Sequence, residues 1–192
     1  MNRWFWVRHG PTHEKTMVGH RDVPADLSDT ALIDRVKAAL PSKALLFSSD
    51  LIRAVDTARV ICPRGTEPTQ TAAFREIDFG AWDGLHWTVI GDRWPDLSRA
   101  FWEQPGDHRA PNGESWNDAL HRISSEVDRL NAMHQNTDFI VAAHFGAILT
   151  QYQRASGKTA YQTLGQKIDN FSITQLNYHA GDWDVALINH IP

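Results

Sequence analysis

Short apolar runs alternate along this chain with longer segments whose apolar residues recur at helical spacing. The runs are residues 3–7, 44–47 and 138–143. Their continuous hydrophobicity predicts strands that are buried on both faces. Helices are predicted after them, over residues 28–40, 48–61 and 146–156. Strands that alternate with helices in this way predict an α/β fold, a three-layer sandwich in which helices cover both faces of a mostly parallel sheet.

Capping residues mark the ends of the predicted helices. Ser28 is a good N-cap for the first helix, which Pro41 stops. Ser48 or Ser49 would cap the second helix. Gly157 ends the third, because glycine readily adopts the left-handed conformation at a helix C-terminus. The second and third helices are therefore expected to begin close to the ends of the strands before them.

Residues 173–190 have a different pattern, with two strand-like runs around a turn that contains Gly181. This arrangement predicts a β-hairpin at an edge of the sheet. A further helix begins at Ser115, and its apolar residues are spaced alternately four and three positions apart. Coiled coils share this spacing, but two heptads are too few for one, so we expect the helix to pack on the sheet.

Residues 86–114 are rich in Trp, Asp, Pro and Gly and have only a weak helical pattern, around 97–102. We expect this segment to be an excursion over the crevice at which the strands end, within one domain that spans residues 1–192. Four tryptophans in or beside it could stack on a flat substrate or seal the core, and the second role is the more common one. They are Trp87, Trp94, Trp102 and Trp116.

Composition and charge narrow the class of protein. A chain of 192 residues with 42% hydrophobic content can build one sizeable core. The net charge of −4 and the lack of any Lys- or Arg-rich run give no electrostatic footprint for nucleic acid. The apolar stretches are too short for a membrane span or a signal peptide, so we expect a cytoplasmic protein. Cys62, the only cysteine, leaves no internal disulfide and is expected to be a buried spacer.

Polar residues follow the ends of the three predicted strands. Arg8 and His9 follow the first strand, Arg53 lies just beyond the Ser-Ser-Asp turn after the second, and His144 follows the third. Because the loops beyond the carboxyl ends of parallel strands converge on one crevice, these side chains are expected to meet there. Two helices also start at this edge, and their unpaired N–H groups favour an anion. The sequence therefore predicts a pocket for a phosphate-sized anion.

Each of these residues has a simpler explanation when it is taken alone. Arg8 could be salt-bridged or solvated, His9 could be a hydrogen-bonded loop histidine, and Arg53 could lie on a solvated helix face. Their common position at strand ends, which independent structural roles would not require, favours the pocket. His9 and His13 also have the spacing of helical metal ligands, but the Gly-Pro pair between them opposes a helix, so we expect no metal site.

Glu76 is a candidate proton donor. It lies among apolar residues in the stretch "FREIDFGAWDG", where glycines allow a tight path. Desolvation and the like charge of a substrate phosphate would both help a carboxyl group there to hold its proton near neutral pH, as a general acid must. An exposed loop glutamate explains the residue equally well, and Asp78 and Asp83 are neighbouring candidates that the spacing does not exclude.

Five segments of the chain occur in a family-specific order. They are "VRHGPT", "SSDLIRAVDTA", "REIDFGAWDG", "GESW" and "VAAHFGAI". In this order they resemble the histidine phosphatase superfamily, also called the phosphoglycerate mutase-like family. The resemblance implies a phosphoglycerate mutase-like α/β sandwich and a phosphoryl-transfer reaction that needs no metal or other cofactor.

The resemblance also implies a role for each candidate residue. His9 would be the nucleophile and become phosphohistidine, and Glu76 would be the proton donor. Arg8, Arg53 and His144 would complete the phosphate pocket, with a protonated His144 as the third positive group. Thr12 stands where the family often has a hydroxyl group near the phosphate.

Departures from the family pattern bear on the reaction and the substrate. Family mutases usually carry an asparagine at the position of Lys15, and they are longer than this chain. The spacing of residues 92–116 looks more like the small phosphatases of the family, including α-ribazole phosphatases. Phe145 stands in an "HFG" where family members often have "HGG", a change that leaves the chemistry intact. Lys15 and Phe145 are therefore counted among the candidate substrate-binding residues.

Taken together, these features favour a metal-independent phosphomonoesterase that acts on a small phosphorylated metabolite through a phosphohistidine. Phosphoryl transfer of the phosphoglycerate mutase type is the first alternative, and a non-catalytic phosphate-binding module is the second. The expected partner is a small phosphate ester, with neither nucleic acid nor membrane.

Overall fold

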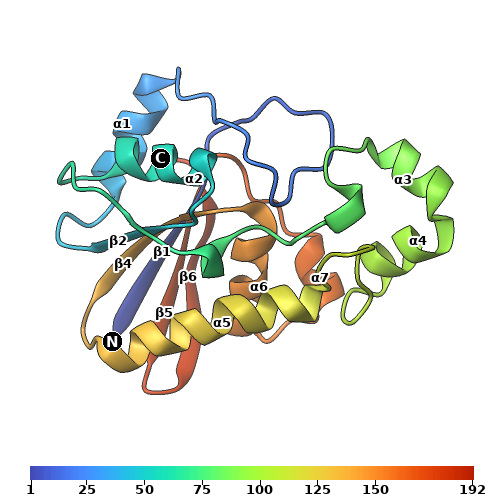
Figure 1. Cartoon of the computed structure of the whole chain (residues 1–192). Coiled ribbons are helices and arrows are strands. Elements are labelled where there is room, and N and C mark those ends of the chain that lie inside the picture. The colour runs from blue at the N-terminus through green and yellow to red at the C-terminus, as the bar shows by residue number, and fades with distance from the viewer.

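A six-stranded sheet in the order β3-β2-β4-β1-β5-β6 forms the centre of the protein (Figure 1). The computed structural model describes residues 1–192. The strands are β1 (Asn2–Arg8), β2 (Leu45–Ser48), β3 (Thr69–Gln70), β4 (Asp138–Ala143), β5 (Ile173–His179) and β6 (Asp182–His190). Strands β1 to β4 pair in parallel, whereas β5 and β6 form an antiparallel hairpin at one edge. The predicted mostly parallel sheet and its edge hairpin are both confirmed.

Seven α-helices and two 3₁₀ helices connect the strands. The α-helices are α1 (Thr30–Ala39), α2 (Ile52–Ile61), α3 (Trp87–Arg93), α4 (Pro95–Glu103), α5 (Trp116–Met133), α6 (Phe145–Ser156) and α7 (Ala160–Leu164). The 3₁₀ helices are η1 (Ala72–Phe74) and η2 (Gly80–Trp82). None of the helices is long and apolar enough to cross a membrane.

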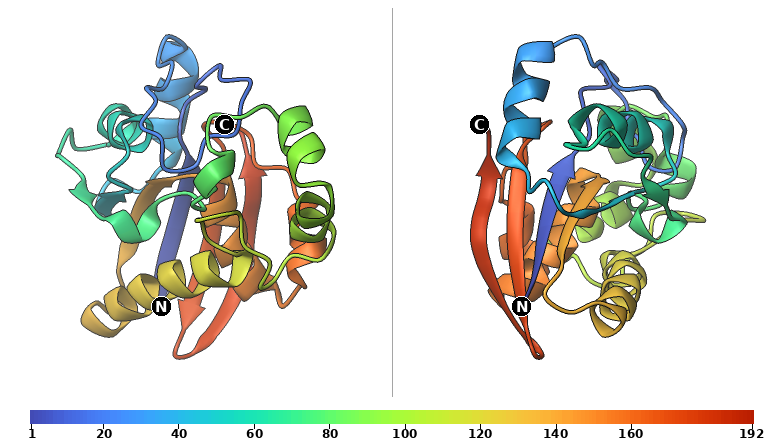
Figure 2. Two further views of the ribbon diagram at one scale, coloured as in Figure 1. Left: turned by 45° about the vertical axis from the view of Figure 1, so that its right-hand side comes forward. Right: turned by 90° about the vertical axis from the view of Figure 1, so that its left-hand side faces the viewer.

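Alternating side chains of the strands build a hydrophobic core on each face of the sheet. In β1, Trp4 and Trp6 belong to one core, and Phe5 and Val7 belong to the other. Helices α5 and α6 contribute to the first core, and α1 and α2 to the second (Figure 2). Because successive residues of a strand point to opposite faces, a run that is buried throughout requires both faces to be covered. The predicted three-layer sandwich is therefore confirmed.

The N-cap of helix α1 lies one residue later than the sequence predicts. Its N-cap is Asp29, whose Oδ1 accepts a hydrogen bond of 3.0 Å from the backbone N–H of Leu32. The N–H of Ser28 instead donates to Oδ1 of Asp26 at 2.9 Å, which places Ser28 in a turn. The prediction of Ser28 as the cap was wrong, because the aspartate that follows it provides an equally good acceptor.

Helix α2 takes its cap from a distant segment. The N–H of Ile52 donates to Oδ1 of Asp22 at 2.7 Å, although 30 residues separate the two. The N-cap position, Leu51, provides no side-chain acceptor, and Ser49 only accepts a bond of 3.1 Å from the N–H of Leu51. The prediction that Ser48 or Ser49 caps this helix was therefore wrong, since tertiary structure provides the carboxylate instead.

The remaining element predictions agree closely with the structure. Gly157 ends α6 with a φ of 66°, and Ser115 caps α5 through a reciprocal pair of bonds with Asp118. Helix α4 covers the weak pattern predicted around residues 97–102, and its Phe101 is buried against Trp82, with ring centroids 5.1 Å apart. Cys62 is buried, as predicted.

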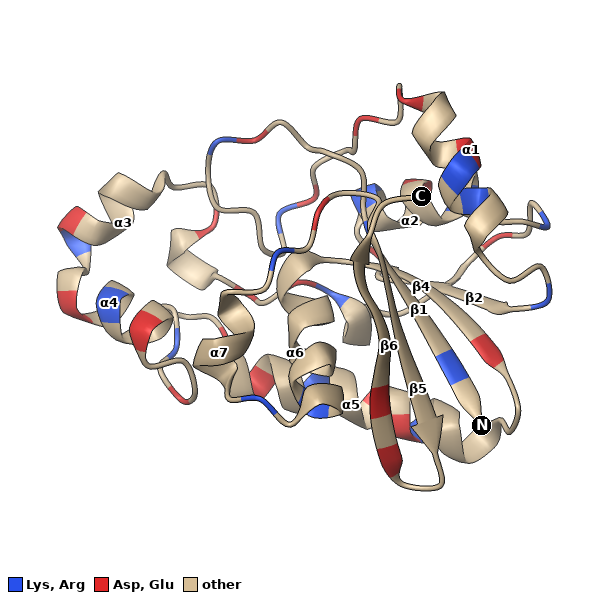
Figure 3. Ribbon diagram, turned by 180° about the vertical axis from the view of Figure 1, so that it is seen from behind, with Lys and Arg blue, Asp and Glu red and all other residues tan.

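Charged residues are interspersed along the ribbon, with acidic and basic positions close to one another (Figure 3). Several pair across elements: Arg3 with Asp138 at 2.6 Å and Arg154 with Asp128 at 2.6 Å. Such pairs at partly exposed positions contribute little to stability, about 0–1 kcal/mol each. The cores on the two faces of the sheet therefore dominate the stability of the fold.

The burial of the two core faces predicts a large difference between two isoleucine substitutions. Ile148→Ala removes a fully buried side chain of α6 and should lower the free energy of unfolding by about 2–5 kcal/mol. Ile52→Ala, at a helical position that is 41% exposed, should change it by less than ~1 kcal/mol. Urea unfolding measures both values, and similar values for the two variants would contradict the assigned core.

Candidate active site

The carboxyl ends of β1, β2 and β4 lie side by side and carry the polar residues predicted from the sequence (Figure 1). In the parallel register, Arg8 pairs with Ala143, so the residues that follow β1 and β4 are neighbours. These residues are His9 and His144, whose ring centroids are 5.1 Å apart. The convergence expected for parallel strand ends thus brings both histidines to one place.

His9 is a buried, neutral imidazole in a defined tautomer. Its Nδ1 lies 2.7 Å from the carbonyl oxygen of Gly10. Because a carbonyl oxygen can only accept, the proton is on Nδ1 and the lone pair is on Nε2. Burial, together with the charges of Arg53 and Arg8, lowers the pKa of His9 from about 6.5 to about 3. The ring is therefore uncharged at neutral pH, with Nε2 available for bonding.

Backbone contacts hold the loop that carries His9. The N–H of His9 donates to the carbonyl of Ala143 at 3.0 Å, and its own carbonyl accepts from Nδ2 of Asn170 at 2.7 Å. The N–H of Gly10 donates to Oγ1 of Thr57 at 3.0 Å. A Cβ at position 10 would lie 2.7 Å from a backbone oxygen of Asp26, so only glycine fits this close approach. These contacts leave the imidazole little freedom to move.

Arg53 is a buried guanidinium without an ion-pair partner. Its side chain comes from the first turn of α2, and the residue is only 1% exposed. Its terminal nitrogens donate to the carbonyl oxygens of Arg21 at 2.9 Å and of Gly19 at 2.7 Å. Burial lowers its pKa, but an arginine remains charged at any physiological pH. Arg53 therefore places a positive charge, with no carboxylate in direct contact, beside the two histidines.

His144 is also neutral, in contrast to the protonated ring that we expected. Nε of Arg53 donates to its Nδ1 at 3.2 Å, and an arginine N–H can only donate, so Nδ1 carries no proton. The proton is on Nε2, which lies 2.7 Å from Oγ of Ser49. Burial and the charge of Arg53 lower the pKa of His144 well below its ordinary value. The expectation of a third positive group was wrong, because the Arg53 contact occupies the nitrogen that would bind the proton.

Arg8 extends from the end of β1 and lines the same cavity as His9. One of its terminal nitrogens donates to the carbonyl of Ile168 at 2.6 Å, and its guanidinium carbon lies 5.4 Å from the centre of the Phe145 ring. Its Nε is buried and has no hydrogen-bond partner. Arg8 therefore keeps free N–H donors on a guanidinium that Phe145 helps to orient.

Glu76 lines the same cavity and is only 6% exposed. Its Oε1 accepts from the N–H of Ile77 at 2.9 Å, and its Oε2 accepts from the N–H of Gly146 at 3.1 Å. A Cβ at position 146 would lie 2.5 Å from Oε1, so glycine at this position allows the carboxyl group to approach the start of α6. The structure thus places Glu76 in the site and not on an exposed loop.

The two other acidic candidates near Glu76 have structural contacts instead. Oδ1 of Asp78 accepts from the N–H of Gly80 at 2.9 Å, and Oδ2 of Asp83 accepts from the N–H of Arg21 at 2.8 Å. Neither carboxyl group lines the cavity. Glu76 is therefore the one of the three that a substrate in this cavity can contact.

The cavity has a volume of about 290 Å³ and a lining of two chemical kinds. Its polar lining residues are Arg8, His9, Thr12, Glu14, Thr16 and Glu76, and its apolar ones are Met17, Val18, Phe79, Trp102 and Phe145. Thr12 and Phe145 thus lie where the sequence predicted. Phe79 was missed, because its irregular segment has no periodic pattern that would have placed it.

Some predicted site residues are not brought into the cavity. Lys15 is exposed and does not line it, and neither do Arg53 and His144, which are buried. Of the four candidate tryptophans only Trp102 lines it; Trp116 is buried in the core, Trp94 packs against the core, and Trp87 is 69% exposed. The core-sealing role, which we expected to be the more common one, holds for Trp94 and Trp116.

The other histidines near the site either bond to structural partners or are exposed. Nε2 of His13 lies 2.7 Å from Oδ2 of Asp26, on the outer side of the loop. Nε2 of His20 donates to the backbone carbonyl of Glu76 at 2.9 Å, which places His20 beside the cavity as a support of its wall. His108 is exposed and does not line the cavity. The structure brings together no group of three His, Cys, Asp or Glu side chains that could hold a metal ion.

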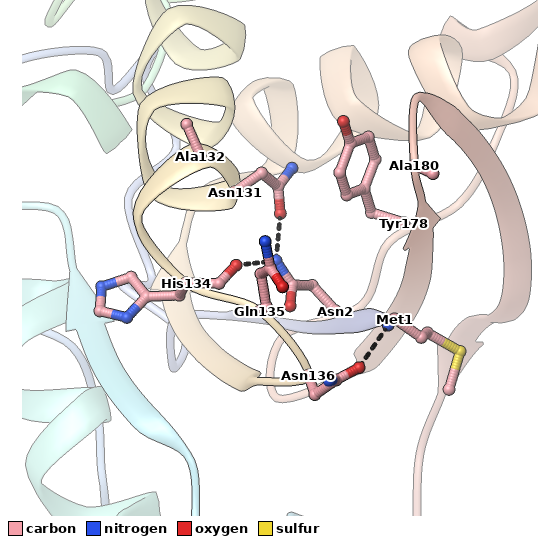
Figure 4. Close-up of a pocket in the computed structure, with 9 residues that line it drawn as sticks. All are labelled: Met1, Asn2, Asn131, Ala132, His134, Gln135, Asn136, Tyr178 and Ala180. Carbon is pink, nitrogen blue, oxygen red and sulfur yellow. Dashed lines mark hydrogen bonds between the residues drawn. The ribbon is translucent and has the colours of Figure 1, made fainter.

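A second cavity, of about 380 Å³, lies near the amino end of β1 (Figure 4). Its walls include Asn2, Asn131, Asn136 and Tyr178. The asparagines bond mainly within the protein, with Nδ2 of Asn2 donating to Oδ1 of Asn131 at 2.9 Å and the amino terminus donating to Asn136 at 2.8 Å. Apart from the amino terminus, this cavity contains no Arg, Lys, Asp or Glu side chain, so the cavity beside His9 is the candidate active site.

Comparison with known proteins identifies the class to which this site belongs. The model of the histidine phosphatase superfamily (branch 1) matches residues 4–191, and the chain belongs to this superfamily. Phosphoglycerate mutase-like protein 4 of Arabidopsis thaliana is 28% identical over 191 residues, which are 94% of this chain and 82% of that protein. The family that the five sequence segments indicate is therefore confirmed.

Solved structures of phosphatases share the fold over nearly the whole chain. A mycobacterial glucosyl-3-phosphoglycerate phosphatase has a TM-score of 0.84 and 26% identity, covering 97% of this chain and 98% of that one. The α-ribazole phosphatase of Shigella flexneri has a TM-score of 0.85 and 20% identity, covering 98% of this chain and 96% of that one. At this identity the second comparison establishes a common fold.

The neutral, buried His9 predicts a loss of stability in acid. With a pKa of about 3 in the folded state and about 6.5 in the unfolded chain, only the unfolded chain binds this proton between these pH values. The contribution of His9 to the free energy of unfolding is complete above about pH 6.5. It is lost as the pH falls toward 3, by up to ~1.4 kcal/mol per pH unit. His144 acts in the same direction, because its pKa is also lowered.

Urea unfolding from about pH 7 to about pH 4 measures this dependence. The His9→Gln variant, which cannot titrate at this position, should lose less stability than the parent protein over the same range. Equal losses in the two proteins would show that His9 does not remain neutral in the folded state.

Proposed function

We propose that this protein is a phosphomonoesterase that transfers the phosphoryl group of a small phosphate ester to His9 and then to water. The observation that carries the proposal is the state of His9, whose neutral ring donates from Nδ1 to Gly10 and makes no hydrogen bond at Nε2. A neutral imidazole nitrogen with a free lone pair is a competent nucleophile. Membership of the histidine phosphatase superfamily and the similarity to a mycobacterial phosphatase support the same reaction.

In the first step, Nε2 of His9 attacks phosphorus in line with the ester bond. A P–N bond forms, the P–O ester bond breaks, and its electron pair goes to the leaving oxygen. Glu76 gives its carboxyl proton to that oxygen. In the second step, Glu76 as a carboxylate takes a proton from water, which attacks the phosphohistidine and releases inorganic phosphate and free His9.

The guanidiniums of Arg8 and Arg53 compensate the charge of the phosphoryl oxygens. Both retain N–H donors beyond those bonded to backbone carbonyls, and both are held in place before substrate binds. Donors that are fixed in advance need no reorganisation during the reaction, which lowers the barrier. Thr12 adds a hydroxyl group to the lining of the cavity that contains Arg8 and His9. Positive charge thus comes from arginine side chains, and the mechanism needs no metal ion.

The walls of the cavity favour hydrolysis over a phosphoglycerate mutase reaction. A phosphoglycerate carries a carboxylate beside its phosphate and needs a second cationic group to bind it. Beyond Arg8, the lining residues include no Lys or Arg, and Glu14 is paired with Arg21 at 2.9 Å. Met17, Phe79 and Trp102 instead form an apolar wall, which fits the leaving group of a more apolar ester.

Replacement of the nucleophile tests the proposal directly. Purified protein should hydrolyse p-nitrophenyl phosphate in the presence of EDTA, and His9→Ala should lower kcat by at least about 10³-fold. His13→Ala is the matched control, because His13 is exposed, bonds to Asp26 and does not line the cavity. Retained activity in His9→Ala, or loss of activity with EDTA, would overturn the mechanism.

Two further measurements separate the alternatives. Rapid acid-free quenching with labelled substrate should trap an acid-labile phosphohistidine in the parent protein and none in His9→Ala. Interconversion of 2- and 3-phosphoglycerate without release of phosphate would favour the mutase. A protein that binds phosphate but has neither activity nor phosphohistidine would be a binding module.

The apolar wall predicts which esters the protein prefers. Trp102→Ala should lower kcat/KM for 1-naphthyl phosphate by about 2- to 10-fold, because the indole ring can stack on a flat leaving group. The same variant should leave kcat/KM for ethyl phosphate nearly unchanged, and Trp87→Ala should affect neither ester, since Trp87 lies outside the cavity. Equal losses for both esters in Trp102→Ala would contradict a stacking role.

A further inference from the structure

Glu76 lies on a segment that has no regular hydrogen-bond ladder of its own. The 3₁₀ helix η1 ends at Phe74, and the next element, η2, begins at Gly80. Between these two elements, the backbone carbonyl groups need hydrogen-bond donors from other parts of the chain. Without such donors they would be unpaired in a partly buried region. The position of the Glu76 carboxyl group therefore depends on contacts to a stretch of irregular backbone.

Arg122 of α5 provides most of these contacts. One terminal nitrogen donates to the carbonyls of Ala73 at 2.8 Å and Arg75 at 3.1 Å, and the other donates to the carbonyl of Glu76 at 3.1 Å. A single planar guanidinium thus bonds three carbonyl groups of the segment that carries Glu76. Few side chains other than arginine have enough donors in a rigid plane for this role.

Glu114 holds Arg122 in the orientation that these bonds need. Its two carboxylate oxygens accept from Nε of Arg122 at 2.8 Å and from a terminal nitrogen at 2.7 Å, in a two-point pair. The same carboxylate accepts from the N–H of Asp78 at 3.0 Å, and the N–H of Glu114 donates to the carbonyl of Asp78 at 2.8 Å. The Arg122–Glu114 pair therefore fixes the backbone on both sides of Glu76.

His20 adds a further contact, since its Nε2 also donates to the carbonyl of Glu76. Neither Arg122 nor Glu114 lines the cavity, so a bound phosphate ester does not touch them. The hydrogen bonds of this pair reach the cavity through the backbone that carries Glu76.

We propose that Arg122, held by Glu114, is the positioning residue for the proton donor Glu76 and acts on protonation of the leaving group, not on phosphate binding. The inference rests on the proposed function, in which Glu76 gives its proton to the departing oxygen. It adds a residue pair on α5 and the preceding loop to the parts on which that proton transfer depends.

The chemistry of the leaving group provides a selective readout. When the P–O bond of p-nitrophenyl phosphate breaks, the electron pair forms a stabilised phenolate, which departs without a proton. Benzyl phosphate is similar in size, but its leaving group is an unstable alkoxide that needs a proton from Glu76 as the bond breaks. The ratio kcat/KM covers only the steps up to phosphoryl transfer to His9, so later hydrolysis of the phosphohistidine does not enter it.

The experiment compares kcat/KM of the full-length protein for these two esters. Arg122→Met should lower the value for benzyl phosphate by about 10- to 100-fold, because a displaced acid transfers its proton poorly. The value for p-nitrophenyl phosphate should change by less than about threefold, and inhibition by inorganic phosphate should be unchanged. Arg129→Met is the matched control, since Arg129 is on the same helix, pairs at two points with Glu126 and contacts no part of the segment 73–76.

Glu76→Gln separates a failure of this inference from a failure of the proposed function. This variant should have a lower kcat/KM for benzyl phosphate and a nearly unchanged kcat/KM for p-nitrophenyl phosphate. If it does not, Glu76 is not the proton donor and the proposed mechanism is wrong at that step. If Glu76→Gln is selective but Arg122→Met reduces both esters equally, or neither, the positioning role is wrong and the proposed function stands.

A milder substitution tests the same inference if Arg122→Met does not fold. Glu114→Gln keeps the size of the side chain but removes its charge, so Arg122 should be held less firmly and the loss should again fall on benzyl phosphate, to a smaller extent. If Arg122→Met does not fold, this variant decides: an equal effect on the two esters, or no effect, overturns the inference.

Discussion

The burial of the Arg53 guanidinium is the constraint on which the rest of the site depends. The residue is 1% exposed and forms no ion pair, and its N–H groups are accepted by the carbonyls of Gly19 and Arg21 and by Nδ1 of His144. Carbonyl dipoles offset only part of the cost of burying a charge. The remaining positive potential holds both histidines in their neutral forms, since each pKa is lowered by burial and by Arg53. A phosphate group is the natural counterion for such a position.

The two sides of the site are held in place by different means. His9 and His144 directly follow paired parallel strands, so the sheet register itself determines their separation. Glu76 has no strand beneath it, and its backbone and carboxyl group are held by donors from α5, from the start of α6 and from His20. Regular structure thus positions His9 and His144, whereas long-range side-chain contacts position Glu76.

The lining of the cavity combines two kinds of structure. Arg8 and His9 come from the end of β1, whereas the loop at 14–18 and Trp102 of α4 provide other parts of the lining. Loops accept substitution more readily than paired strands do, so the part of the lining that loops provide can change while the strand ends are retained. The solved glucosyl-3-phosphoglycerate phosphatase and α-ribazole phosphatase share the fold.

Local pattern in the sequence determined every strand except β3, most of the helices, the edge hairpin and the placing of Arg8, His9, Arg53 and His144 at or just beyond strand ends, because burial period and breaker residues act within a few positions of the chain. Only the tertiary structure decided the Asp22 cap of α2, the neutral state of His144 and the choice of Glu76 over its acidic neighbours. It also excluded Lys15 from the cavity and brought in Trp102. These features depend on which atoms meet across 30 or more residues of intervening chain, as Asp22 meets Ile52, and no local pattern encodes the path of the loops between them.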